Sequence, residues 1–292
     1  MRCDSAAYDA RLESRNAFYR ALYTPAILIR QLRVVARSIA FIVLTVTHYL
    51  WFELAYALLP KDSQRLFFLR TRIYQSWGRR VARAFGMTLA IKGTPPKPPY
   101  FFVMNHLSYV DILIAAINLP GAKFIAKHDL AGWFLLGPMA KRIDTIFVDR
   151  SSLSAVTDVC DRVDAALKAG YGVGMAPEAT TSKGEGVLPF HPALFEPAVR
   201  LNVPVCYATL RYSTPQGEMP AFKIVNWWED MTFQAHALRF LGVKSFDATV
   251  HFGDHLISGK NRKILAKDLH QAISANFKPM VTAEGEPLDR MQ

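Results

Sequence analysis

Short apolar runs alternate with stretches of helical periodicity along most of the chain, and this alternation constrains the fold more than any other feature. Strands are expected at residues 89–92, 100–104, 123–125, 145–148, 172–176, 204–210, 222–225 and 248–252. Helices are expected at residues 65–85, 109–118, 130–142, 151–169, 194–201 and 262–277. Such alternation is typical of parallel strands covered by helices. The sequence therefore predicts an α/β fold with a mostly parallel central sheet flanked by helices.

The composition fits one large core and excludes several protein classes. The chain has 292 residues, of which 51% are hydrophobic, and this excludes intrinsic disorder. Cys3, Cys160 and Cys206 are odd in number and far apart, so they form neither a zinc pattern nor a disulfide framework, and a reducing compartment is expected. His251 and His255 lie four residues apart without an evident third ligand, so no metal site is expected.

The first hundred residues carry all of the excess positive charge. Residues 1–100 hold 16 Lys and Arg against 5 Asp and Glu, whereas residues 101–292 hold 19 of each. The longest apolar run, residues 38–60, would span about 34 Å as a helix. Three arginines lie on one helical face before it: Arg30, Arg33 and Arg37. A basic and apolar segment is typical of attachment to anionic lipid, whereas nucleic acid is disfavoured because the apolar residues form aliphatic runs.

These features predict two main parts and a short tail. Residues 1–60 are expected to form a helical membrane-anchoring module that spans the bilayer or dips into one leaflet, although the apolar run could instead be a buried core helix. Residues 61–280 are expected to form the α/β domain, and residues 281–292 a polar tail. The protein is therefore expected at a membrane, on its cytoplasmic face.

A histidine and an aspartate follow the strand expected at residues 100–104. His106 and Asp111 are five residues apart, about 140° on an ideal helix, so they meet only if His106 lies on a turn and Asp111 in the first helical turn. Ser108 favours this arrangement, because Ser-x-x-Asp before an apolar run resembles a capping box. Two interpretations remain: Asp111 only caps the helix, or it orients His106 as a general base near neutral pH.

Two more polar clusters follow expected strands. In α/β proteins, ligand-binding sites usually lie at the carboxyl ends of the parallel strands. Arg150 follows one strand; it could bind a phosphate with its planar guanidinium or form a surface ion pair with Asp149. Glu178 follows another and begins a loop with hydroxyls, a lysine and two glycines. This loop could wrap the polar atoms of a ligand, or it could simply be solvated.

In their order and spacing, these clusters resemble the sequence blocks of the glycerolipid acyltransferase family, whose familiar members are the 1-acylglycerol-3-phosphate acyltransferases. Four blocks are matched: Asn-His-x-x-x-x-Asp by Asn105, His106 and Asp111; the second by residues 145–150; Pro-Glu-Gly-Thr by residues 177–180; and Val-Pro-Val by residues 203–205. The resemblance covers residues 90–210.

The resemblance implies transfer of a fatty acyl group from acyl-CoA or acyl carrier protein to the free hydroxyl of lysophosphatidic acid or a related lysophospholipid, in phospholipid biosynthesis or remodelling. His106 would be the general base, oriented by Asp111. It implies no covalent acyl-enzyme, no metal and no cofactor. The residues implied to bind substrate come from three of the blocks: Asn105, Arg150, Glu178, Ala179, Thr180 and Thr181.

Two residues depart from the family pattern. Ala179 replaces a glycine, so the loop there needs a negative φ or carries strain. Thr181 stands where many phosphate-recognising members have arginine, which makes a lyso-lipid with another head group, such as a lyso-ornithine lipid, an alternative acceptor.

Two other functions stay open. A non-enzymatic, membrane-associated α/β protein would account for the basic residues 1–100 but not for the clustered polar side chains. A hydrolase that uses His106 with Ser108 is disfavoured, because the sequence has no Gly-x-Ser-x-Gly nucleophile elbow.

Overall fold

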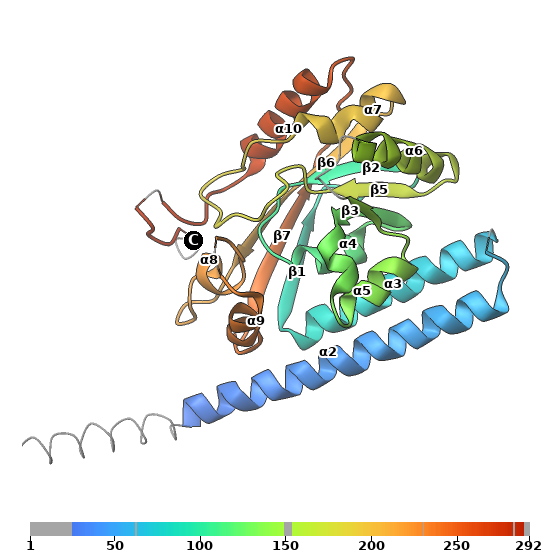
Figure 1. Ribbon diagram of the computed structural model, residues 1–292. Coiled ribbons are helices and arrows are strands. Elements are labelled where there is room, and N and C mark those ends of the chain that lie inside the picture. The colour runs from blue at the N-terminus through green and yellow to red at the C-terminus, as the bar shows by residue number, and fades with distance from the viewer. Residues whose placement is uncertain (1–24, 62, 149–153, 230, 283, 289–292) are drawn as a thin grey trace, which may run out of the picture.

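The computed structural model describes residues 25–61, 63–148, 154–229, 231–282 and 284–288, and it shows a seven-stranded sheet with helices on both faces (Figure 1). In the order β1-β7-β6-β2-β5-β3-β4, the strands are β1 (Met87–Lys92), β7 (Phe246–Phe252), β6 (Val205–Ser213), β2 (Tyr100–Met104), β5 (Gly172–Met175), β3 (Ala122–Lys127) and β4 (Ile146–Val148). Every pairing is parallel except β6 with β7. The mostly parallel central sheet is therefore confirmed.

The helices lie on the two faces of this sheet. They are α2 (Pro25–Leu58), α3 (Gln64–Ala84), α4 (Asp111–Asn118), α5 (Leu136–Arg142), α6 (Ser154–Lys168), α7 (Glu196–Arg200), α8 (Ala221–Ile224), α9 (Phe233–Leu241) and α10 (Arg262–Asn276), with 3-10 turns η1 (His128–Gly132) and η2 (Pro192–Phe195). Helices α3 and α4 cover one face, and α6 and α10 cover the other (Figure 1).

Strand β2 lies in the middle of the sheet, and its side chains alternate between the two faces. Tyr100, Phe102 and Met104 belong to the core under α3 and α4, whereas Phe101 and Val103 belong to the core under α6 and α10. All five are buried, which is typical of a strand covered on both faces. The carboxyl end of β2 is thus a rigid support for the turn that follows.

Four expectations about elements need correction. Residues 222–225, expected as a strand, lie in the short helix α8 and just after it, because a short apolar run fits either element. Helix α9 was not expected. The helix expected at residues 130–142 is divided between η1 and α5, and that at residues 194–201 between η2 and α7.

Helix α2 contains the apolar run as far as Leu58 and packs along α3 (Figure 1). Two polar contacts join the helices: Trp77 Nε1 donates to Thr45 Oγ1 at 3.1 Å, and His48 Nε2 lies 3.2 Å from Ser76 Oγ. The described ranges contain no helix that is long and apolar enough to cross a membrane.

The arginines before the apolar run are used within the fold. The guanidinium of Arg33 donates to the carbonyl of Gly242 at 2.7 Å. Arg37 is buried and donates to the carbonyls of Leu241, Val243 and Lys244, where α9 ends. Cations at a helix C-terminus satisfy its free carbonyls. Two arginines expected to flank a membrane segment therefore fasten α2 to the α/β domain.

Candidate active site

The turn between β2 and α4 brings His106 and Asp111 into contact. Nδ1 of His106 lies 2.7 Å from Oδ2 of Asp111. The backbone N–H groups of Leu107 and Ser108 donate to the same oxygen at 2.8 and 3.2 Å. Asp111 thus closes the turn and holds the imidazole at once.

The start of α4 differs from the expected capping box. The N-cap position is Val110, which makes no side-chain bond. Ser108 Oγ accepts a hydrogen bond from the backbone N–H of Val110 at 3.3 Å, while Asp111 reaches back to the N–H of Ser108. Only the acidic half of the box is present, and it comes from the residue that also binds His106.

The surroundings of Asp111 determine which nitrogen of His106 carries a proton. Asp111 is 2% exposed and accepts two backbone N–H groups as a carboxylate. Nδ1 of His106 therefore donates to it, and Nε2 keeps the lone pair. The His106 side chain is 30% exposed, and no described residue forms a hydrogen bond with Nε2. The imidazole can accept a proton from a molecule that approaches it.

Asn105 is a structural partner of the sheet. Its side-chain amide donates to the carbonyl of Leu210 at 2.9 Å and accepts from the N–H of Leu210 at 2.7 Å. Asn105 is 1% exposed, and one hydrogen bond engages its amide nitrogen and another its amide oxygen. The residue extends the β2–β6 pairing by one step and fixes the position of His106.

Glu178 joins two loops at the carboxyl edge of the sheet. One carboxylate oxygen accepts the N–H of His106 at 2.6 Å, and the other accepts the N–H of Leu188 at 2.9 Å. The backbone N–H of Ser182 in turn donates to the carbonyl of His106 at 3.1 Å. The third sequence block is therefore bonded to the first through both main chain and side chain.

Burial changes the acidity of Glu178. The residue is 2% exposed, and burial raises the pKa of its carboxyl to about 7, although the N–H groups of His106 and Leu188 act in the opposite direction. A carboxyl group with a pKa near neutrality gives the site a protonation change in the physiological range.

The rest of the third block lies closer to solvent. Ala179 has φ of 61°, so the negative φ that its side chain would prefer is not adopted and the turn is strained. Thr180 is exposed and Thr181 is half-buried, so both hydroxyls are near the surface beside the turn that carries His106. Arg150 lies outside the described residues.

Two hydrogen bonds at this site were not predicted from the sequence. The hydroxyl of Tyr212, on β6, donates to Oδ1 of Asp111 at 2.7 Å. The N–H of Trp227 donates to the carbonyl of Leu107 at 2.9 Å. Neither residue lies in a recognised block, and the sequence separation of Tyr212 from Asp111 is 101 residues, so no local pattern indicates the contact.

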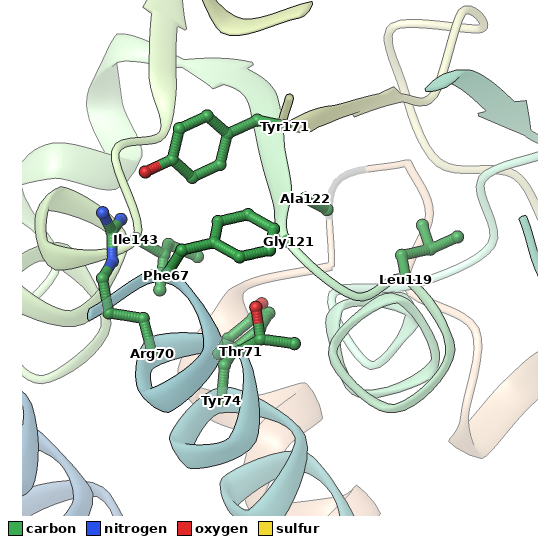
Figure 2. Close-up of a pocket in the computed structure, with 9 residues that line it drawn as sticks. All are labelled: Phe67, Arg70, Thr71, Tyr74, Leu119, Gly121, Ala122, Ile143 and Tyr171. Atoms are coloured by element: carbon green, nitrogen blue, oxygen red, sulfur yellow. The ribbon is translucent and has the colours of Figure 1, made fainter. Parts of the chain in front are cut away.

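The pocket in Figure 2 lies at the opposite edge of the sheet. Gly121 and Tyr171 directly precede the amino ends of β3 and β5, whereas His106 follows the carboxyl end of β2. Its volume of about 20 Å³ has room for about one water molecule. Within the described parts of the chain, no group of three or more His, Cys, Asp or Glu side chains could hold a metal ion.

Comparison with known proteins points to one family. Residues 89–210 match the model of the family described as Acyltransferase, and a 1-acyl-sn-glycerol-3-phosphate acyltransferase of Neisseria meningitidis is 33% identical over 154 residues. Both similarities support the glycerolipid acyltransferase family for residues 89–210. The matched region contains every block from which the resemblance was inferred. That alignment spans 52% of this chain and 60% of the Neisseria protein.

Two further proteins extend the comparison. A lyso-ornithine lipid O-acyltransferase of Brucella abortus is 28% identical over 229 residues, which cover 71% of this chain and 85% of that protein. The crystal structure of a 1-acyl-sn-glycerophosphate acyltransferase from Thermotoga maritima matches with a TM-score of 0.54 and 17% identity, over 82% of this chain and 97% of that one. The structural likeness shows that the two chains share a fold.

Proposed function

We propose that this protein transfers a fatty acyl group from acyl-CoA or acyl carrier protein to the free hydroxyl of a lysophospholipid or related lyso-lipid. One observation carries the proposal: a buried carboxylate holds Nδ1 of His106 at 2.7 Å, and Nε2 is left without a partner among the described residues. An imidazole oriented in this way is suited to remove a proton from an alcohol near neutral pH.

The reaction follows from this geometry. Nε2 of His106 takes the hydroxyl proton as the oxygen attacks the thioester carbonyl, and Asp111 stabilises the imidazolium that forms. The new carbon–oxygen bond replaces the carbon–sulfur bond, and the departing thiolate takes the proton back from His106. The scheme needs no acyl-enzyme, no metal and no further cofactor, and the acyl donor is a substrate.

The residues around the base have different roles in this scheme. Asn105 and Glu178, which the family resemblance implies as substrate contacts, have their polar atoms engaged by backbone groups, which supports a role in positioning His106. Contacts to the acceptor then come from the strained Ala179 turn, from Thr180 and Thr181, and from Arg150.

Two acceptors follow from the relatives. The Neisseria relative is named for 1-acyl-sn-glycerol-3-phosphate, and the Brucella relative, named for lyso-ornithine lipid, aligns over a larger part of this chain. Thr181 offers no positive charge for a bare phosphate. The proposed acceptor is thus lysophosphatidic acid or a related lysophospholipid, with a lyso-ornithine lipid as the second candidate.

An acceptor dissolved in a bilayer requires an enzyme that lies on the bilayer, and α2 has a suitable surface. Large apolar side chains at least 40% exposed run along one face of the helix: Leu28, Leu32, Val35, Ile39, Ile42, Val46, Leu50, Leu54 and Leu58. The helix α3 beside it has six arginines and no acidic residue. We propose that this module rests on the cytoplasmic face of an anionic membrane.

An assay with several lyso-lipid acceptors tests the enzymatic proposal. Wild-type protein is supplied with acyl-CoA or acyl carrier protein and with lysophosphatidic acid, lysophosphatidylcholine, a lyso-ornithine lipid or no acceptor, and thiol release is measured. We expect release only with a lyso-lipid. Release without any acceptor would support the hydrolase, and no release with any pair would support the non-enzymatic membrane protein. Ser108→Ala should retain activity, because the side chain is fully buried.

Vesicle co-sedimentation tests the membrane proposal. Ile39→Glu places a charge in the apolar face of α2 and should weaken binding to vesicles that contain anionic lipid. Ile264→Glu on α10 is the matched control, since Ile39 is 56% exposed and Ile264 is 58% exposed. Equal binding of the two variants would contradict the assignment of α2 as the membrane face.

A further inference from the structure

Strand β6 contacts the active-site turn at two points. Leu210 exchanges two hydrogen bonds with the side chain of Asn105, and the hydroxyl of Tyr212 donates to Asp111 at 2.7 Å. Leu210 makes its contacts through the main chain, and Tyr212 makes its contact through the side chain. One rigid strand thus contacts the residue before His106 and the carboxylate that holds the imidazole.

We propose that Tyr212 is a positioning residue for the general base: its hydroxyl holds Oδ1 of Asp111 so that Oδ2 stays directed at Nδ1 of His106. The inference rests on the proposed function, because it assigns how the base of that reaction is kept in place. Tyr212 lies just beyond residues 89–210, which the family model matches.

The bonds around Asp111 show why this contact matters. Oδ2 interacts with the ring of His106 and with the N–H groups of Leu107 and Ser108. Oδ1 receives only the Tyr212 hydroxyl among the residues that the structure describes. A carboxylate held at one oxygen can still rotate about its Cβ–Cγ bond, whereas donors at both oxygens fix its plane. Tyr212 therefore supplies the second fixed point.

The surroundings of Tyr212 make it a reliable donor. Burial, with the nearby Asp111 carboxylate adding to it, raises the pKa of the Tyr212 phenol well above its ordinary value, so the hydroxyl stays protonated. Its side chain is fully buried, and its ring lies 5.9 Å from that of Phe246 on β7. A group placed by a packed strand is positioned more accurately than one on a loop.

Removing the hydroxyl has a predictable electrostatic consequence. In Tyr212→Phe, Oδ1 of Asp111 loses its donor, so more negative charge faces the imidazole of His106. This charge favours the imidazolium, which cannot act as a base, so the acid limb of the pH profile of kcat/KM should move to higher pH, by about half a unit to one unit. The free rotation of Asp111 should also lower kcat at the plateau about 10-fold.

The experiment measures kcat, KM for the lyso-lipid and the pH profile for wild type, Tyr212→Phe and Tyr74→Phe. Tyr74 is the matched control, because its ring is also buried and its hydroxyl has no hydrogen-bond partner in the described structure. We expect the shifted limb and lower kcat only in Tyr212→Phe, with KM little changed. A lower melting temperature with an unmoved limb and unchanged kcat would assign a purely structural role and overturn the inference.

His106→Ala separates this inference from the proposed function. If His106→Ala keeps wild-type activity, the proposed base is wrong, and the inference falls with it. If His106→Ala is inactive while Tyr212→Phe and Tyr74→Phe both behave as wild type, the proposed function stands and only the role of Tyr212 is refuted.

Discussion

The two edges of the parallel part of the sheet both carry charged side chains, but they are organised differently. At the carboxyl edge, the carboxylates of Asp111 and Glu178 are buried and bonded, and Nε2 of the half-buried His106 has no hydrogen-bond partner among the described residues. At the amino edge, around the pocket of Figure 2, the cations pair with a half-exposed carboxylate. Only the first arrangement presents a single reactive atom.

The charged side chains at the amino edge form a structural cluster around Asp144. Arg70 donates to Asp144 at 2.8 Å and to the carbonyl of Arg142 at 3.0 Å. Lys123 lies 3.5 Å from the same Asp144 carboxylate and 4.3 Å from the ring of Tyr171. Both cations contact one carboxylate, so the cluster joins α3, the end of α5 and β3. The comparison predicts losses of activity at one edge and losses of stability at the other.

The largest effect is expected from Asp111→Asn. An amide cannot accept the imidazole N–H and both backbone N–H groups as the carboxylate does, and it can favour the wrong tautomer of His106. We expect kcat to fall on the order of 10³-fold. Asp144→Asn is the control at the other edge and should leave kcat within about twofold. Similar losses of kcat in the two variants would remove the distinction between the edges.

Arg70→Met should lower the stability of the protein and leave its activity unchanged, in contrast to Asp111→Asn. The change removes the bonds to Asp144 and to the Arg142 carbonyl while keeping an apolar stem, so the free energy of unfolding should fall by about 2 kcal/mol. The kcat should stay near that of wild type. Denaturant unfolding measures the loss, with Arg72→Met, at an exposed position on α3, as a control of little effect. A fall in kcat without loss of stability would show that the amino edge contributes to catalysis.

Glu178 should make stability depend on pH. Because its pKa in the fold is raised from 4.5 to about 7, its contribution is fully present below pH 4.5 and is lost as the pH rises through about 7. Melting temperatures measured across this range should decline less in Glu178→Gln than in wild type. The exposed neighbour Glu185 is the control, and Glu185→Gln should keep the wild-type decline. Parallel curves for all three proteins would refute the raised pKa.

The smallest effect is expected from Ala179→Gly. Glycine adopts positive φ without steric cost, so the change relieves strain of about 1 kcal/mol, partly offset by the greater freedom of glycine in the unfolded chain. The melting temperature should rise slightly. Ala176→Gly, at a position without positive φ, should lower it. A lower melting temperature for Ala179→Gly would show that the turn tolerates alanine without strain.

The sequence predicted the parts that depend on local pattern. The strands β2 and β5, buried on both faces, were recognised from apolar runs. A turn at His106 was recognised as the condition under which His106 and Asp111 could meet. The short helix α8 was mistaken for a strand, because a few apolar residues satisfy either periodicity.

Contacts between distant parts of the chain could not be predicted. Arg37 binds carbonyls more than 200 residues away, and its position beside an apolar run indicated a membrane flank instead. The backbone role of Glu178 and the contact of Tyr212 with Asp111 likewise depend on how β5 and β6 are placed beside β2. The apolar runs identified β5 and β6 as strands, but they did not indicate which residues Glu178 and Tyr212 would contact.

The most direct test of the account is the rate of thiol release by His106→Ala with an acyl donor and the best lyso-lipid acceptor. The exposed His255, which pairs with Asp254, supplies the matched control His255→Ala. We expect a loss of at least about 10²-fold in His106→Ala and a wild-type rate in His255→Ala. A folded His106→Ala variant that transfers acyl groups at the wild-type rate would contradict it.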